Sequence, residues 1–180
     1  MFDQISTLLG FHPSELAGAH ASGEIPLPAP FVNRLIAAQL AESGTPVSAV
    51  TVEPRDGNVV LAHVRLRASF VPPLTVHMRI EQQPRLPESP TLVIRWSLTG
   101  LGILGRLAGP LLAIVDRLPP GMSVNGDLMT IDVAQILKAR GYGDAMAMLI
   151  HLEVCAEQGR FVVRAAGRMP EFAPDAARHD

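Results

Sequence analysis

The stretch VVLAHVRLRASFVPPLTVHMRIE, residues 59–81, decides the fold because apolar and polar side chains alternate along both of its halves. A period of two is typical of β-strands that bury one face and expose the other. The pair Pro72–Pro73 predicts a turn between two antiparallel strands. The expected inner face holds Val60, Ala62, Val64, Leu66, Val76 and Met78, and the expected outer face holds His63, Arg65, Arg67, His77, Arg79 and Glu81.

Neighbouring segments extend this pattern into an antiparallel meander with one buried face. VSAVTVEP, residues 47–54, precedes it across a turn at Asp56–Gly57, a strong hairpin signal. TLVIRWSL, residues 91–98, follows it, with Leu92, Ile94, Trp96 and Leu98 expected inside. Two further hairpins are predicted, one on Asn125–Gly126 and one within residues 149–166.

Helical spacing appears in two other places. In GEIPLPAPFVNRLIAAQLAESG, residues 23–44, three prolines predict an extended entry, and apolar residues then recur at helical spacing from Phe31 to Leu40. We expect an amphipathic helix of about three turns that ends before Gly44. A second helix is expected from Asp132, which can cap its N-terminus, to Gly141.

The most apolar segment is GLGILGRLAGPLLAIVDRLPPG, residues 100–121. Arg106 near its middle and the Gly109–Pro110 break argue against a membrane-spanning helix. We expect two helical pieces, residues 101–108 and 111–118, that are buried against the sheet. A position at a membrane interface is the alternative that the sequence leaves open.

Composition narrows the classes of function. The 180 residues fit one domain, with apolar residues at 48%, aromatic residues at 4% and a formal net charge of −2. Neither the charge nor the aromatic content favours nucleic acid as a partner. One cysteine excludes an internal disulfide and a cysteine-cluster metal site. No catalytic motif is present, and the glycines of GLGILG match a dinucleotide fingerprint only weakly, so we expect no enzyme, no cofactor and no metal.

The domain boundaries and the compartment follow from the two ends of the chain. Residues 1–24 are expected to form an N-terminal extension with a short helix, residues 25–168 a single α+β domain, and residues 169–180 a disordered tail. Asp3 stands where a signal peptide carries positive charge, and the apolar run after it is short. We therefore expect a cytoplasmic protein that associates with membranes at most peripherally.

The order of the elements resembles the bacterial TULIP-like (tubular lipid-binding) proteins. A helix in IPLPAPFVNRLIAAQL is followed by the meander, a second apolar region, the hairpin and helix of MSVNGDLMTIDVAQIL, and the last hairpin IHLEVCAEQGRFVVRAA. The likeness covers roughly residues 24–167. It implies a strongly curved antiparallel sheet wrapped around apolar and amphipathic helices, with lipid tails held between helix and sheet.

The expected function is the non-catalytic binding or carriage of a lipid or similar amphiphile in an elongated apolar cavity, for which an aliphatic, methionine-containing interior is suited. The expected lining residues are Leu35, Ile36, Leu66, Met78, Ile94, Trp96, Ile103, Leu104, Leu111, Leu112 and Val115. Contact with anionic headgroups or a membrane is expected at Arg65, Arg67, Arg79 and Arg95. The alternative is a protein-interaction or homodimerisation module with a filled core that docks through residues 101–118.

Overall fold

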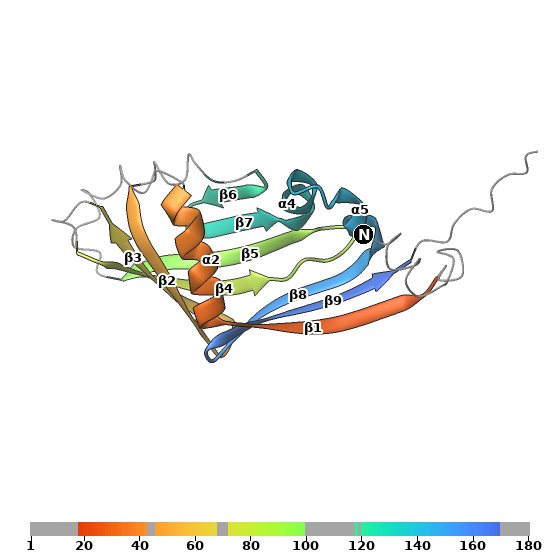
Figure 1. The fold of residues 1–180 in the computed structure, drawn as a ribbon, viewed down its shortest axis with the longest axis horizontal. Helices are drawn as coiled ribbons and strands as arrows, with labels where there is room; N and C mark the ends of the chain where they lie inside the picture. Colours follow the sequence, from red (N-terminus) through yellow and green to blue (C-terminus); the bar gives the residue numbers. More distant parts are fainter. Residues whose placement is uncertain (1–17, 43–45, 68–71, 100–117, 119, 170–180) are drawn as a thin grey trace, which may run out of the picture.

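The computed structural model describes residues 18–42, 46–67, 72–99, 118 and 120–169, which form two antiparallel sheets and three helices (Figure 1). The six-stranded sheet has the order β2-β3-β4-β5-β7-β6, and the three-stranded sheet has the order β1-β9-β8. The strands are β1 (His20–Pro28), β2 (Val47–Arg55), β3 (Val59–Leu66), β4 (Leu74–Gln82), β5 (Thr91–Thr99), β6 (Met122–Asn125), β7 (Leu128–Asp132), β8 (Leu149–Glu157) and β9 (Arg160–Arg168). The helices are α2 (Ala29–Glu42), α4 (Val133–Ala139) and α5 (Gly143–Met148).

The expected α+β class with antiparallel strands is therefore confirmed, but the strands belong to two sheets and not to one. β1 begins at His20, five residues before the expected start of the domain, because it pairs along its whole length with β9. α5 was not expected, since six residues are too few to show a helical period. The expected short helix in residues 1–24, the two pieces of residues 101–118 and most of the expected tail lie outside the described residues.

The alternation in residues 59–81 places apolar side chains on one face of the sheet and polar side chains on the other, as predicted. Val60, Ala62 and Leu66 of β3 are buried, whereas His63, Arg65 and Arg67 are exposed. In β4 the same rule leaves His77 and Arg79 exposed and Met78 half-buried. The six-stranded sheet thus has one apolar face and one polar face.

Two hairpin turns form where the sequence predicts them, each with a glycine of positive φ, although their loops differ from the predicted Asp56–Gly57 and Asn125–Gly126 pairs. Gly57 and Asn58 both have positive φ, 75° and 61°, in the turn between β2 and β3. In the β6–β7 hairpin the loop is Gly126–Asp127, one residue later than expected, and Gly126 has φ 60°. Glycine accepts this conformation without steric cost, which fixes the position of the turn.

Helix α2 follows β1 directly and packs against β2, so that it lies across the strands at one end of the six-stranded sheet (Figure 1). Val32 and Ile36, one turn apart, contact the core cluster formed by Val52, Val60, Ala62 and Ala156. Because Ala156 belongs to β8, this cluster joins the two sheets. Asp132 caps α4 as predicted, since its side chain accepts a hydrogen bond from the backbone N–H of Gln135 at 3.0 Å.

Side-chain amides bind the backbone of two edge strands, β2 and β8. Asn33 of α2 donates to the carbonyl of Val52 at 3.1 Å and accepts from its N–H at 2.7 Å. Gln83, just after β4, makes the same pair of bonds to Val154 of β8, at 2.8 and 2.9 Å. Each amide replaces one residue of a neighbouring strand, so α2 is tied to β2 and the loop after β4 is tied to β8.

Candidate functional site

An apolar pocket of about 280 Å³ lies on the inner face of the six-stranded sheet. Inward side chains of β2, β3, β4 and β5 form its floor, and the β6–β7 hairpin and Leu118 complete its wall. Its lining is aliphatic except for one tryptophan: Val50, Val52, Ala62, Val64, Leu74, Val76, Met78, Trp96, Leu98, Leu118, Val124 and Met129. No charged side chain among the described residues lines it, and this lining is suited to hydrocarbon rather than to a polar substrate.

Two of the expected lining residues, Met78 and Trp96, line this pocket. Ile36 packs instead against the core cluster around Val52, and Leu66 is buried in a second cluster with Val47. Ile94 lies on the inward-facing side of β5 but does not border the pocket. Ile36 and Leu66 thus belong to the core and do not line the pocket, and Ile94 does not line it either.

The expectation for Leu35 is wrong, because its side chain is 54% exposed. The apolar residues of α2 span a broad stripe, and the sequence does not tell which edge of that stripe meets the sheet. Val32, Ile36 and Leu40 pack inward. Leu35 is turned about 100° away from Ile36 on the helix. The remaining expected residues, Ile103, Leu104, Leu111, Leu112 and Val115, lie outside the described residues.

Several lining residues were missed for a topological reason. Val124 and Met129 come from the β6–β7 hairpin, which reaches the pocket because β7 pairs with β5. No sequence pattern predicts the pairing of β7 with β5. Val50 and Val64, by contrast, alternate with outward residues of β2 and β3, and that alternation would have found them.

Trp96 is the only tryptophan of the chain and borders the pocket. Its indole N–H is buried and has no hydrogen-bond partner among the described residues. A buried donor without a partner costs about 1–3 kcal/mol. The side chain of Trp96 therefore carries one buried donor that is unsatisfied among the described residues.

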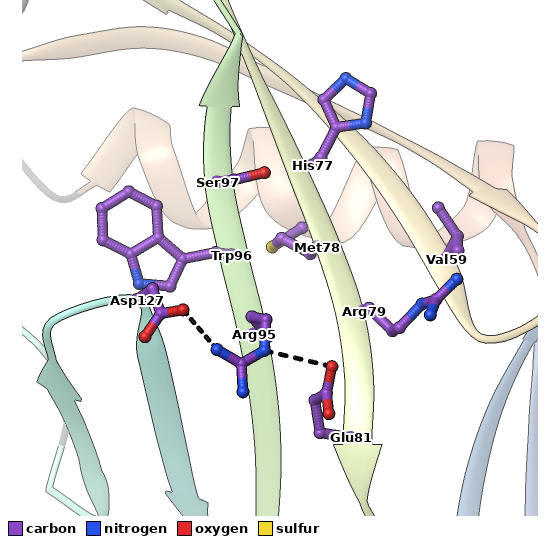
Figure 2. A pocket seen from close by; sticks show the side chains of 9 residues that line it. All are labelled: Val59, His77, Met78, Arg79, Glu81, Arg95, Trp96, Ser97 and Asp127. Atoms are coloured by element: carbon purple, nitrogen blue, oxygen red, sulfur yellow. Dashed lines mark hydrogen bonds and ion pairs between the residues drawn. The ribbon is translucent and has the colours of Figure 1, made fainter.

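A second pocket, of about 410 Å³, lies on the polar face of the same sheet (Figure 2). Arg79 and Arg95 are directly opposite each other on β4 and β5. Arg95 contacts Glu81 at 3.3 Å and also pairs with Asp127, and Asp127, followed by Glu81, raises the pKa of this guanidinium. No described carboxylate forms an ion pair with Arg79, which makes it the uncompensated cation of this pocket.

The four arginines expected to act together do not form one patch. In the observed register Arg79 is opposite Val59 and His63 is opposite Thr75. Arg65 therefore lies six residues along β3 from the position opposite Arg79, about 20 Å away. The expected register assumed that the turn was at Pro72–Pro73. In the observed pairing the midpoint between β3 and β4 comes earlier in the sequence than Pro72–Pro73. Arg67 borders a different hollow, between α2 and β2.

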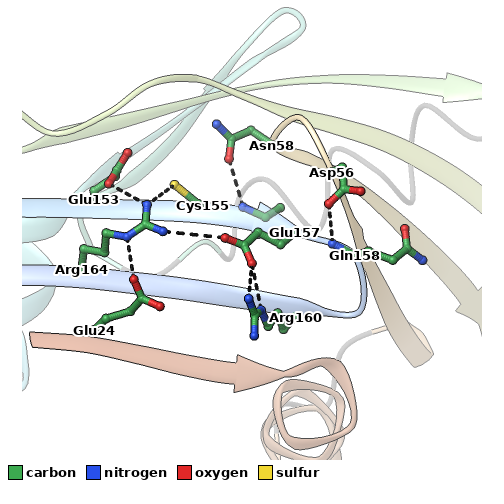
Figure 3. A network of polar contacts seen from close by, with 10 residues as sticks. Glu24, Asp56, Asn58, Glu153, Cys155, Glu157, Gln158, Arg160 and Arg164 are labelled. Carbon is green, nitrogen blue, oxygen red and sulfur yellow. Dashed lines mark hydrogen bonds and ion pairs between the residues drawn. The ribbon is translucent and has the colours of Figure 1, made fainter.

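A polar network covers one face of the three-stranded sheet (Figure 3). Arg164 of β9 contacts Glu24 at 2.8 Å, Glu153 at 3.1 Å and Glu157 at 3.7 Å. The hydrogen bond from Arg164 lowers the pKa of Glu153. Burial, together with Glu153, raises the pKa of the Cys155 thiol. Cys155 is thus held as a neutral thiol at neutral pH, which is the opposite of an activated nucleophile.

The described part of the chain holds no cluster of three or more histidine, cysteine or acidic side chains that could bind a metal. None of its helices combines the length and the hydropathy that a membrane crossing requires. Comparison with protein-family models, with curated proteins and with solved structures gives no match.

Proposed function

We propose that the protein binds a lipid or similar amphiphile in the apolar pocket and carries it without catalysing a reaction on it. The observation that carries the proposal is the lining, in which eleven aliphatic side chains and Trp96 surround about 280 Å³. Small-molecule pockets usually measure about 300–1,000 Å³. The volume is thus suited to one acyl chain or part of one, and not to a bulky polycyclic ligand.

The energetics follow from the apolar lining. Each methylene group transferred from water into such a pocket contributes about 0.8 kcal/mol, which is about a four-fold gain in affinity. The gain ends when the pocket is full.

We also propose, as the TULIP-like resemblance implies, that the sheet curves around helix and ligand together. We further propose that the protein is cytoplasmic and contacts anionic membranes transiently. Arg79 is the best candidate for such contact because it has no ion-pair partner among the described residues. Since Arg79 lies on the polar face, this contact would be made on the side of the sheet opposite the apolar pocket.

Titration of delipidated protein with saturated fatty acids of increasing chain length tests the proposal. We expect the Kd to fall about four-fold per methylene and then to level off. Val64→Phe, which fills the pocket, should abolish this series, whereas Leu61→Phe, on the other side of β3, should leave it unchanged. No binding at any length would exclude the carrier and favour the interaction module with a filled core.

A further inference from the structure

Strand β1 has one edge without a strand partner in the described structure. The backbone bonds at both of its ends, Met169 N–H to Ala19 and Ala29 N–H to Gly159, show that its odd-numbered residues bond to β9. In an antiparallel ladder the residues between them direct N–H and C=O away from that partner. The outward groups therefore belong to His20, Ser22, Glu24, Pro26 and Pro28.

Side-chain amides occupy one backbone position on each of two other edge strands, β2 and β8, whereas no such amide binds β1 among the described residues. Asn33 binds the backbone of Val52 on β2, and Gln83 binds that of Val154 on β8. On β1, Pro26 and Pro28 offer no outward N–H, which is how natural sheets protect an edge. The first half of the strand, His20–Glu24, has no such protection.

Residues 20–24 are exposed on both sides of the strand, and Ile25 beside them is 59% exposed. Within residues 20–24 the outward groups of His20, Ser22 and Glu24 have no strand partner among the described residues, and such an edge is a template for one more strand. Because Pro26 follows this segment, pairing cannot continue with full hydrogen bonding beyond HASGE on that side.

We propose that this edge pairs antiparallel with the same edge of a second copy of the chain, around a two-fold axis at Ser22. Ser22 is then opposite Ser22 of the second copy, and His20 is opposite its Glu24. The small residues Ala21 and Gly23 face each other at the closer, non-hydrogen-bonded positions. An imidazole N–H of His20 can donate a hydrogen bond to the Glu24 carboxylate directly across the ladder, and the two-fold axis produces this pair twice.

Other registers do not give this complementarity. An axis at Glu24 brings two carboxylates together and places Pro26 opposite Ser22, where a donor is lost. An axis at His20 brings two imidazoles together and leaves Glu24 outside the paired segment. In the proposed register Glu24 keeps its bond to Arg164, made through Oε2, and presents Oε1 to the second copy. The two three-stranded sheets become one sheet of six strands.

Ser22→Pro is the direct test, because it removes an outward N–H and leaves the ladder to β9 intact. Sedimentation up to about 1 mM protein, the range of weak interfaces, should show a dimer for the unaltered chain and dimerisation at least about ten-fold weaker for Ser22→Pro. His20→Glu, which places carboxylates opposite each other twice, should weaken the dimer in the same way even if the proline variant folds poorly. Pro26→Ser restores a donor and should not weaken it.

Cross-linking identifies the register. In a Cys155→Ala background, Ser22→Cys places two cysteines about 5.5 Å apart between Cα atoms, within the range for a disulfide. Ile25→Cys, equally accessible, places them about 20 Å apart and is the matched control. Faster dimer formation by Ser22→Cys supports the proposal. A monomer at all concentrations, a dimer that survives Ser22→Pro, or equal cross-linking of both variants would overturn it.

Discussion

Replacing Asn33 by alanine tests whether the side-chain amide that joins α2 to β2 holds the fold together. The amide makes two hydrogen bonds to one residue, at 3.1 Å to the carbonyl and 2.7 Å from the N–H of Val52. Val52 is 8% exposed and belongs to the core cluster beneath α2. In Asn33→Ala both backbone groups lose their partner in a position with little access to water.

The expected loss follows from those two groups. A buried donor or acceptor left without a partner costs about 1–3 kcal/mol. Partial access to water on the helix side reduces the sum, so we expect Asn33→Ala to lower the free energy of unfolding by about 2–4 kcal/mol. That is a large part of the roughly 5–15 kcal/mol typical of a domain. Asn33→Asp should also destabilise, because it keeps the acceptor but sets an oxygen against the Val52 carbonyl.

Urea unfolding followed by far-ultraviolet circular dichroism measures the effect as a lower midpoint with an unchanged m-value. Gln39→Ala is the matched control, since Gln39 is an exposed amide on the same helix. Its effect should stay within about 0.5 kcal/mol. If Asn33→Ala falls in the same range as Gln39→Ala, the amide does not hold α2 on the sheet and the reasoning is refuted.

Two further predictions concern the polar network on the three-stranded sheet. Because burial and Glu153 raise the pKa of Cys155, we expect iodoacetamide to alkylate it more slowly at pH 7.5 than an unstructured cysteine peptide, and equal rates would contradict this. Arg164 lowers the pKa of Glu153 in the folded state, so their pairing stabilises the fold above the ordinary glutamate pKa of about 4.3 and is lost as the pH falls through the lower folded value. The stability difference between the unaltered chain and Arg164→Gln should therefore shrink from about pH 5 towards pH 2 in urea unfolding series, and a constant difference would show that Glu153 is not the group involved.

Local pattern was sufficient to predict the strands other than β1, the helices α2 and α4, and the inward faces of β3, β4 and β5. Each depends on side chains close in sequence, such as the alternation around His63 or the cap at Asp132. Met78 and Trp96 were found as lining residues for the same reason. Leu35 was assigned wrongly because the apolar stripe of α2 is wider than the face that contacts β2.

Long-range pairing accounts for what could not be predicted. The division into two sheets depends on contacts such as that between Gln83 and Val154, 71 residues apart, in which a side chain replaces a strand. The observed register of β3 and β4 places Arg65 far from Arg79 along the sheet, and the alternation within each strand does not determine that register. The pairing of β7 with β5 brought Met129 to the pocket, and no local signal marks it.

Trp96, the only tryptophan of the chain, borders the apolar pocket and can report directly on an acyl chain bound there. The measurement is quenching of Trp96 fluorescence by a fatty acid brominated along its chain, with the unbrominated acid as control. We expect the brominated acid to quench Trp96 in a saturable way, and we expect this quenching to disappear in Val64→Phe. Quenching no greater than that by the unbrominated acid, or quenching that persists in Val64→Phe, would contradict it.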